Sequence, residues 1–136
     1  MQDKYIQTLL KEAEKAYKMG EIPVGAIIVY DDEVIAKAHN NRQSKYCLLG
    51  HAEINAIIKA EKKLKDWRLD KCIMYVTLAP CKMCEIMINE SRISKVYYLI
   101  KNVENTCDNF NELSGYLREK REYEEMLKKF FKNLRK

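Results

Sequence analysis

The sequence predicts an α/β fold in which helices cover both faces of a mixed sheet. Three observations predict it: helix-like and strand-like segments alternate along the 136 residues, two strand-like segments flank a helix-like one, and 47% of the residues are hydrophobic. Two strands that are joined through a helix pair in parallel, whereas a hairpin is antiparallel, so the sheet should be mixed. The apolar content is enough for a single core, and we expect residues 1–136 to form one domain.

A helix and a hairpin should open the fold. Apolar residues recur at the spacing of one helical face over residues 3–19, and Gly20 stands where this helix should end. Residues 24–30 and 33–38 are apolar runs rich in β-branched side chains, and two aspartates separate them. This pattern predicts two strands that are joined by a turn.

The remaining elements follow from the same patterns. Residues 39–46 are polar and predict a loop, and residues 52–64 have helical spacing. Short apolar runs at 73–78 and 96–100 predict strands, with a helix between them that begins at Pro80. The closing segment 113–134 predicts a long amphipathic helix with a candidate break at Gly115, and no fifth strand is evident between 102 and 117.

Composition excludes several classes of protein. No stretch approaches the roughly 20 apolar residues of a membrane helix, and the polar start has no apolar signal core behind it, so we expect a cytoplasmic protein without a membrane partner. Five cysteines without an export signal favour metal binding or core packing over disulfides. We interpret Cys47, Cys72 and Cys107 as small apolar side chains, Trp67 as a packing residue, and Phe130 and Phe131 as residues that dock the last helix.

The net charge of +5 is concentrated at the C-terminal end. Five positive charges, and no acidic residue, occur from residue 128 onward: Lys128, Lys129, Lys132, Arg135 and Lys136. A basic helix end is either a surface that contacts phosphates or a solvated terminus favoured by the helix dipole. Lys128, Lys132, Arg135 and Lys136 are therefore candidate contacts to RNA phosphates.

Two short motifs predict a zinc site. Cys81 and Cys84 follow Pro80 and are three residues apart, so the first turn of a helix places both sulfurs on one side. A helix N-terminus also favours thiolate over thiol. His51 is the best candidate for a third ligand, because it too precedes a helix. Three protein ligands leave one position for water, which is typical of a catalytic site.

Glu53 is the candidate proton carrier. It lies two residues after His51 and can reach a zinc-bound water without coordinating the metal. A redox pair would leave His51 and Glu53 without a role, and the remaining His and Cys residues lack the paired spacing of a structural zinc site. Together the motifs match the H-x-E and P-C-x-x-C signature of zinc nucleobase deaminases.

On these residues the chain resembles the bacterial tRNA adenosine deaminases, which convert the wobble adenosine of a tRNA anticodon to inosine. The matching segments are Glu21-Ile-Pro-Val-Gly-Ala26, His39-Asn-Asn-Arg42, His51-Ala-Glu53, Trp67-Arg-Leu69, Tyr75-Val-Thr-Leu-Ala-Pro-Cys81, Cys84, Ser91-Arg-Ile93 and Phe130-Phe-Lys-Asn-Leu-Arg135. They extend from the first helix to about residue 95 and return in the last helix.

The resemblance implies a three-layer α/β/α fold of the cytidine-deaminase type with a mixed central sheet. It also implies a zinc cofactor, an anticodon stem-loop of tRNA as substrate, and a homodimer with the active site near the subunit contact. Asn40 matches the asparagine that hydrogen-bonds the bound nucleoside, and Pro23 and Val24 match residues that line the base pocket.

The chain departs from the family in three places, one of which is the region from Asn102 to Leu117, which is shorter than usual. Ala79 stands where the family usually has a glutamate that is not a zinc ligand, so the chemistry should survive. Leu99-Ile-Lys-Asn102 replaces a Gly-x-x-Asp segment that borders the RNA, which affects substrate choice more than chemistry. Two alternatives therefore remain: a deaminase of a free nucleobase or nucleoside of the guanine or cytosine type, and a catalytically silent, zinc-stabilised RNA-binding module.

Overall fold

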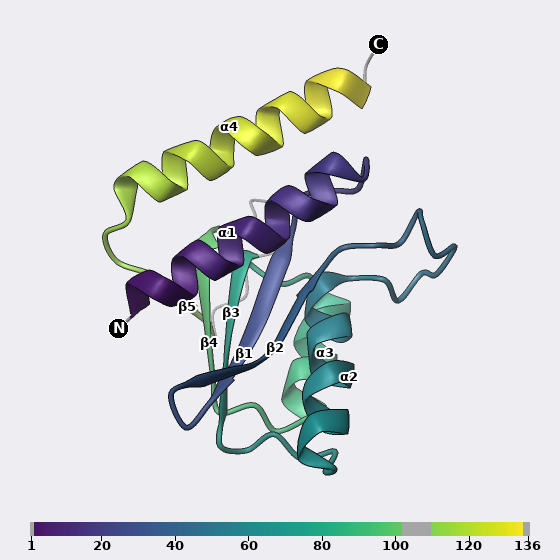
Figure 1. Cartoon of the computed structure of the whole chain (residues 1–136), viewed down its shortest axis with the longest axis vertical. Helices are drawn as coiled ribbons and strands as arrows, with labels where there is room; N and C mark the ends of the chain where they lie inside the picture. The colour runs from purple at the N-terminus through teal and green to yellow at the C-terminus, as the bar shows by residue number, and fades with distance from the viewer. Residues whose placement is uncertain (1, 102–109, 135–136) are drawn as a thin grey trace.

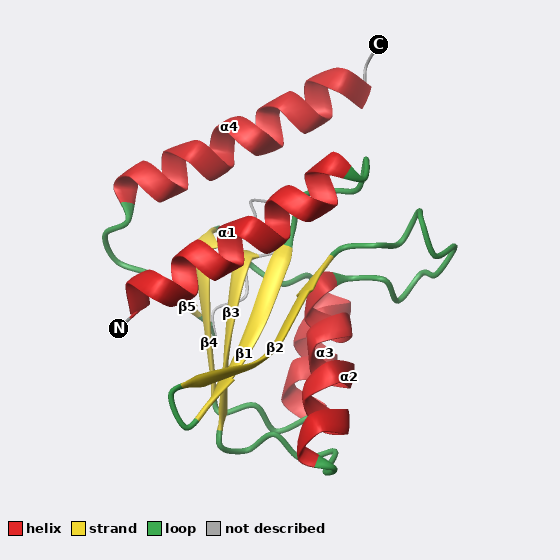
Figure 2. Ribbon diagram, viewed as in Figure 1, coloured by secondary structure: helices red, strands yellow, loops and turns green. Residues whose placement is uncertain are grey.

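The computed structural model describes residues 2–101 and 110–134, in which a five-stranded sheet lies between two pairs of helices (Figure 1 and Figure 2). Its elements are α1 (Gln2–Lys18), β1 (Gly25–Tyr30), β2 (Glu33–His39), α2 (Ala52–Leu64), β3 (Cys72–Leu78), α3 (Lys82–Glu90), β4 (Lys95–Ile100), β5 (Asn111–Glu112) and α4 (Leu117–Leu134). The prediction of a three-layer fold with a mixed sheet is confirmed.

The strands lie in the order β2-β1-β3-β4-β5. β1 is antiparallel to both β2 and β3, whereas β3 and β4 are parallel because α3 connects them. The prediction that 102–117 holds no fifth strand was wrong, since Asn111 and Glu112 pair in parallel with Tyr97 and Tyr98. Two polar residues are too few to show the alternation of apolar and polar side chains that predicts a strand. This strand is therefore defined by its pairing with the edge of β4 and not by its own sequence.

Each face of the sheet has its own core. α2 and α3 cover one face, and α1 and α4 cover the other (Figure 1). Side chains of a strand alternate between faces. Ala26 and Ile28 therefore belong to the core under α2 and α3, and Ile27 and Val29 to the core under α1 and α4.

The backbone of helix α1 lies in direct contact with Gly25 at the start of β1. A Cβ atom at Gly25 would lie 2.6 Å from the carbonyl oxygen of Leu9 and 2.8 Å from the nitrogen of Ala13. Only glycine leaves room for this approach. The contact fixes the segment before β1, which borders the pocket described below.

Several side chains differ from their predicted environments. Trp67 is 57% exposed, and Cys47 lies exposed in the loop after β2, so neither is a packing residue. Phe130 is buried as predicted, but Phe131 is not. Cys72 is buried, and Cys107 lies outside the described residues.

Two helix starts also differ slightly from prediction. α3 begins at Lys82, with Cys81 rather than Pro80 next to it, and α4 begins only after Gly115, whose φ is 77°. Within the described ranges, no helix has the length and apolar character needed to cross a bilayer.

Candidate active site

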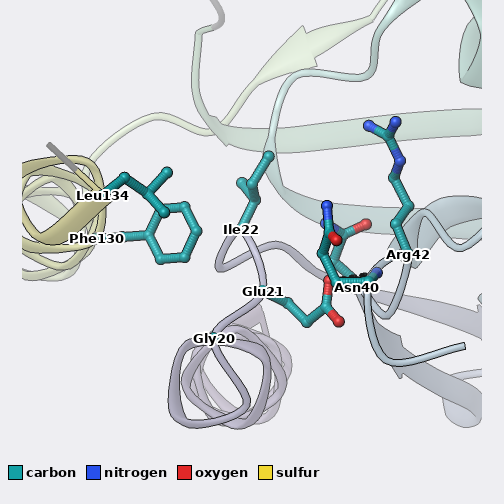
Figure 3. A pocket seen from close by; sticks show the side chains of 8 residues that line it. Gly20, Glu21, Ile22, Asn40, Arg42, Phe130 and Leu134 are labelled. Atoms are coloured by element: carbon teal, nitrogen blue, oxygen red, sulfur yellow. Dashed lines mark hydrogen bonds between the residues drawn. The ribbon is translucent and has the colours of Figure 1, made fainter. Parts of the chain in front are cut away.

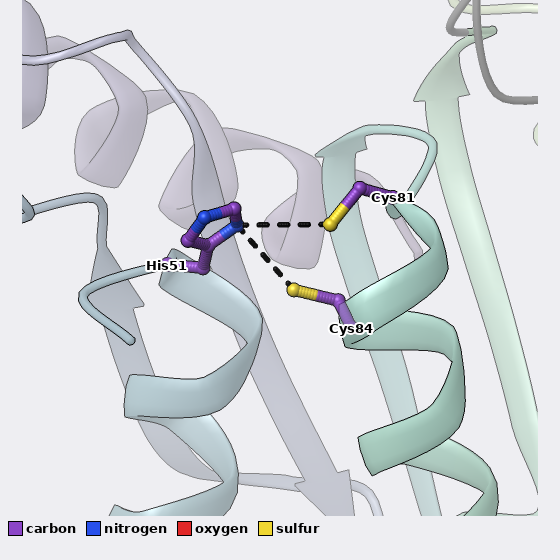
Figure 4. A group of neighbouring side chains, drawn as sticks. All are labelled: His51, Cys81 and Cys84. Atoms are coloured by element: carbon purple, nitrogen blue, oxygen red, sulfur yellow. Dashed lines mark hydrogen bonds between the residues drawn. The ribbon is translucent and has the colours of Figure 1, made fainter. Parts of the chain in front are cut away.

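The three predicted zinc ligands lie together where two helices begin (Figure 4). His51 is the N-cap of α2, Cys81 is the N-cap of α3, and Cys84 lies in the first turn of α3. The Nδ1 atom of His51 lies 3.9 Å from Sγ of Cys81 and 3.5 Å from Sγ of Cys84. Neither cap residue bonds its own helix through the side chain, so the imidazole and thiol groups are available to a metal.

The donor atoms have the spacing that a zinc ion requires. All three lie within 4.8 Å of one another. Zn–N bonds of about 2.0–2.1 Å and Zn–S bonds of about 2.3 Å at a tetrahedral angle place nitrogen and sulfur about 3.5–3.6 Å apart. The observed distances of 3.5 and 3.9 Å lie at or slightly above this range, so an ion fits with little movement. One coordination position would remain open.

Protons are unevenly shared within this group. Hydrogen bonds from Cys84 and His51 lower the pKa of Cys81 to about 3. The hydrogen bond with Cys81, together with burial, raises the pKa of Cys84, and the same thiolate raises the pKa of His51. Zinc is bound by thiolates and by neutral imidazole, so binding at these donors would release the protons that they carry.

Glu53 is a buried carboxyl group beside these donors. It lies in the first turn of α2 and is 4% exposed. Burial raises the pKa of Glu53 to about 7. A carboxyl group that titrates near neutral pH can both accept and release a proton during a reaction.

A small pocket of about 150 Å³ opens on this group. His51, Glu53 and Cys81 contribute to its lining. The other walls come from the start of β1, the loop after β2 and the end of β3: Ile22, Val24, Asn40, Arg42, Leu78 and Ala79. Apolar walls with one amide and one guanidinium suit a flat ring with polar edges.

A larger pocket of about 540 Å³ continues from the small one (Figure 3). The two share Ile22, Asn40 and Arg42. On the far side, Phe130 and Leu134 of α4 face Ile22. Together the pockets form a groove that is longer than a single ring needs.

The loop between β2 and α2 is held by side chains outside it. The buried carboxylate of Glu21 accepts hydrogen bonds from the N–H groups of Gln43 at 3.0 Å and Ser44 at 2.7 Å. At the other end of the loop, the Nδ2 group of Asn55 donates to the carbonyl of His39 and to Oδ1 of Asn41. These bonds place Asn40 and Arg42 at the pockets.

The other predicted residues have different positions. Asn40 and Val24 line the small pocket, and Pro23 lies in the chain between two lining residues. Lys128 and Lys132 border a separate shallow depression on α4, with Leu127 and Phe131. Arg135 and Lys136 lie outside the described residues, as does Asn102 of the altered segment.

Sequence reasoning did not place several lining residues at the site, among them Arg42, Ile22, Phe130 and Leu134, and gave Phe130 only the role of docking the last helix. Arg42 could have been identified as a pocket residue, because it lies only two positions after Asn40 in the same loop. Ile22, Phe130 and Leu134 show no such signal, because only the packing of α4 brings them together.

Comparisons with known proteins agree with the site. The profile of the family described as the cytidine and deoxycytidylate deaminase zinc-binding region matches residues 1–100. The tRNA-specific adenosine deaminase of Bacillus subtilis is 38% identical over 146 aligned residues, covering 97% of this chain and 89% of that protein. The tRNA-specific adenosine deaminase of Aquifex aeolicus is 40% identical, covering 96% and 94%.

Solved structures give a similar result. One, from a study of A-to-I editing by tRNA deaminases at the wobble position, has a TM-score of 0.77 and 31% identity, and covers 84% of this chain and 98% of that chain. The guanine deaminase of Bacillus subtilis has a TM-score of 0.71 and 33% identity, and covers 74% and 65%. The profile match includes all three donor residues and Glu53.

Proposed function

This chain belongs to the family of the cytidine and deoxycytidylate deaminase zinc-binding region, and from that premise we propose that it converts adenosine to inosine at the wobble position of a tRNA anticodon. The buried Glu53 beside three metal donors, at a small pocket, carries the proposal. Similarity to tRNA-specific adenosine deaminases over nearly the whole chain supports the substrate.

We assign zinc binding to His51, Cys81 and Cys84. Zinc in a site with three protein ligands lowers the pKa of water and so supplies a nucleophile at neutral pH. The chain contributes the geometry: two helix starts fix the imidazole and the thiolates, and burial keeps the site away from bulk solvent.

Glu53 moves the protons. Hydrolytic deamination forms a carbon–oxygen bond from water at the ring carbon and breaks the carbon–nitrogen bond to the amino group, which leaves as ammonia. Glu53 accepts the proton that water loses, gives it to the neighbouring ring nitrogen, and assists protonation of the amine. Its carboxyl group is buried and lines the small pocket beside the donors, so it faces a ring that is held there.

The pocket walls hold the nucleoside. The amide of Asn40 can donate and accept, so it can bond two polar groups of the nucleoside at once. Val24 and Leu78 offer apolar surface to the base. Arg42 stands at the junction of the two pockets, where a phosphate linked to the bound nucleoside would pass.

The groove favours RNA over a free base. A free-base enzyme needs only the small pocket, whereas the larger pocket beside it has room for neighbouring nucleotides. The runner-up, a guanine or cytosine type of deaminase, is retained because a guanine deaminase has the same fold at 33% identity. A silent RNA-binding module would have no use for a buried carboxyl group beside the donors.

The decisive experiment is incubation of the zinc-loaded protein with an anticodon stem-loop that carries a wobble adenosine. Sequencing should detect inosine, and the variant Glu53→Gln should bind zinc and RNA but form none, because an amide cannot carry a proton. Guanine and cytosine, tested in parallel for ammonia release, should be inactive. Activity on either base without inosine in the RNA would replace this proposal by the runner-up.

A second test concerns the basic end of the chain. Replacing Lys128, Lys132, Arg135 and Lys136 with Gln should weaken RNA binding and lower the slope of log affinity against log salt by about 0.7 to 0.9 per lost phosphate contact. The control replaces Lys62 and Lys63 on α2. Single-turnover rates at saturating RNA should stay unchanged. An unaltered salt slope would favour the solvated-terminus interpretation.

We further propose a cytoplasmic homodimer that associates through α2 and α3. Ile58 on α2 and Ile86 and Met87 on α3 are exposed apolar side chains on the two helices whose first turns carry the candidate ligands. Sedimentation should give a dimer for the parent and a monomer for Ile86→Glu. The control Leu117→Glu changes an exposed residue of α4 and should remain dimeric. A monomeric parent would overturn this assignment.

A further inference from the structure

A buried tyrosine of α4 is hydrogen-bonded at the point where β1 and β3 separate. Tyr123 is fully enclosed, and its hydroxyl donates to the carbonyl of Pro23 at 2.6 Å. The hydroxyl of Thr77 donates to that of Tyr123 at 3.0 Å, and the N–H of Gly25 donates to the hydroxyl of Thr77 at 3.1 Å. Two of these bonds thus connect α4 to the segment before β1 and to the end of β3, and the third connects β1 to β3.

These bonds stand where the pairing of β1 with β3 ends. The last pair is Ala26 with Val76. Beyond it, the carbonyl of Pro23 and the N–H of Gly25 bond to side-chain hydroxyls instead of to backbone groups of β3. Buried backbone groups need partners. The two hydroxyls supply them, so the strands can part inside the protein.

The small pocket opens in this gap. Val24 follows Pro23, and Leu78 and Ala79 follow Thr77; all three line the pocket together with Glu53. Burial raises the pKa of Tyr123, so the phenol remains a donor at neutral pH. Phe130, seven residues further along α4, lies in the wall of the larger pocket.

We propose that Tyr123 is a positioning residue for the deamination: with Thr77, it sets the separation of Val24 from Ala79 and so holds the base against Glu53. This inference rests on the proposed function. Tyr123 lines neither pocket and acts through the segments that it bonds. A displacement of about 1 Å at a reacting group can cost about 100-fold in rate.

The test compares two buried tyrosines in the zinc-loaded full chain. Tyr123→Phe removes the hydroxyl at the pocket. Tyr5→Phe is the matched control, because Tyr5 is also buried and its hydroxyl donates to the carbonyl of Asp32 at 2.9 Å, in the turn at the other end of β1. Tyr5→Phe loses one hydrogen bond, whereas Tyr123→Phe loses two, the one to Pro23 and the one from Thr77, so Tyr123→Phe should lose more thermal stability.

Only the pocket variant should lose turnover. On the anticodon stem-loop, Tyr123→Phe should lower kcat by about tenfold or more with KM nearly unchanged and zinc content intact. Tyr5→Phe should keep the parent's kcat. Thr77→Val should reproduce the defect and Thr77→Ser should avoid it, which provides a second pair should Tyr123→Phe fold poorly. Equal kcat in Tyr123→Phe and Tyr5→Phe would overturn the proposal.

A second readout does not depend on the substrate. Amide hydrogen exchange of residues 21–27 should be faster in Tyr123→Phe than in Tyr5→Phe, because the bonds at Pro23 and Gly25 weaken. If the parent forms no inosine, the proposed function is wrong. The hydrogen-exchange measurement then still tests whether Tyr123 holds the segment before β1 in place. Equal exchange in the two variants would reject it.

Discussion

Replacing Gly50 with Ala should impair catalysis as well as stability. Its new Cβ atom would lie 2.7 Å from the nitrogen of Arg42 and 2.7 Å from Oδ1 of Asn41, whereas ordinary contact begins at 3.4 Å. These neighbours must therefore give way by about 0.7 Å, the difference between the two distances. The displaced segment carries Asn40 and Arg42 into the pockets, and Gly50 itself precedes His51.

The expected magnitudes follow from that displacement. Overpacking of this kind costs about 1–3 kcal/mol of folding free energy. A shift approaching 1 Å in a pocket wall should lower kcat/KM by roughly 10- to 100-fold, or about 1.4–2.7 kcal/mol in the barrier. The assay is initial-rate kinetics on the stem-loop, with the melting temperature measured on the same samples.

Gly115→Ala provides the matched control. Gly115 has a φ of 77° and nothing within 4 Å of a new Cβ atom, so alanine there is strained but not crowded. The strain costs about 1–2 kcal/mol, comparable with the cost at Gly50. Similar melting temperatures with a rate loss in Gly50→Ala alone would confirm the reasoning. A rate for Gly50→Ala within about threefold of the control would refute it.

Three further predictions concern the metal, acid stability and the last helix. Cys84→Ala should lose zinc and unfold at lower temperature, because metal binding contributes to folding; elemental analysis that finds one zinc per chain would contradict this. Burial alone would raise the pKa of Glu12, but hydrogen bonds from Lys15 and His39 lower it below 4.5. The carboxylate therefore stabilises the fold above that pH and loses this effect as the pH falls. Between about pH 6 and about pH 3, the free energy of unfolding, measured with a chemical denaturant, should fall more in the parent than in Glu12→Gln. Phe130→Ala should lower the free energy of unfolding in urea by about 3 kcal/mol and raise KM for RNA. An unchanged KM would show that α4 does not contribute to RNA binding in the groove.

The grouping of the candidate metal ligands could be predicted because its signals are local. His51, Glu53, Cys81 and Cys84 lie at two helix starts, and each helix is evident from its own spacing. The same holds for the parallel strands, since the intervening helix dictates their direction. The structure brings the two motifs together as the sequence predicts.

What the sequence could not predict depends on contacts between distant segments. Tyr123 bonds a carbonyl 100 residues earlier, which no spacing indicates. Trp67 and Cys47 have apolar side chains that usually pack, yet the segments that carry them lie outside both cores. The larger pocket likewise exists only because Phe130 and Leu134 reach Ile22.

The two edges of the sheet affect how copies of this protein behave at high concentration. A bare edge strand is a template on which another chain can add. Here one edge is β2, where Glu33 and Lys37 are exposed charged residues. The amine of Lys59 donates a hydrogen bond to the carbonyl of Lys37 at 2.8 Å, so this edge carbonyl already has a partner. The other edge is β5, which is only two residues long. Pairing of sheet edges between copies, which would build open-ended fibres, is therefore disfavoured. Association through helix faces remains possible, and a two-fold symmetric contact there stops at a dimer.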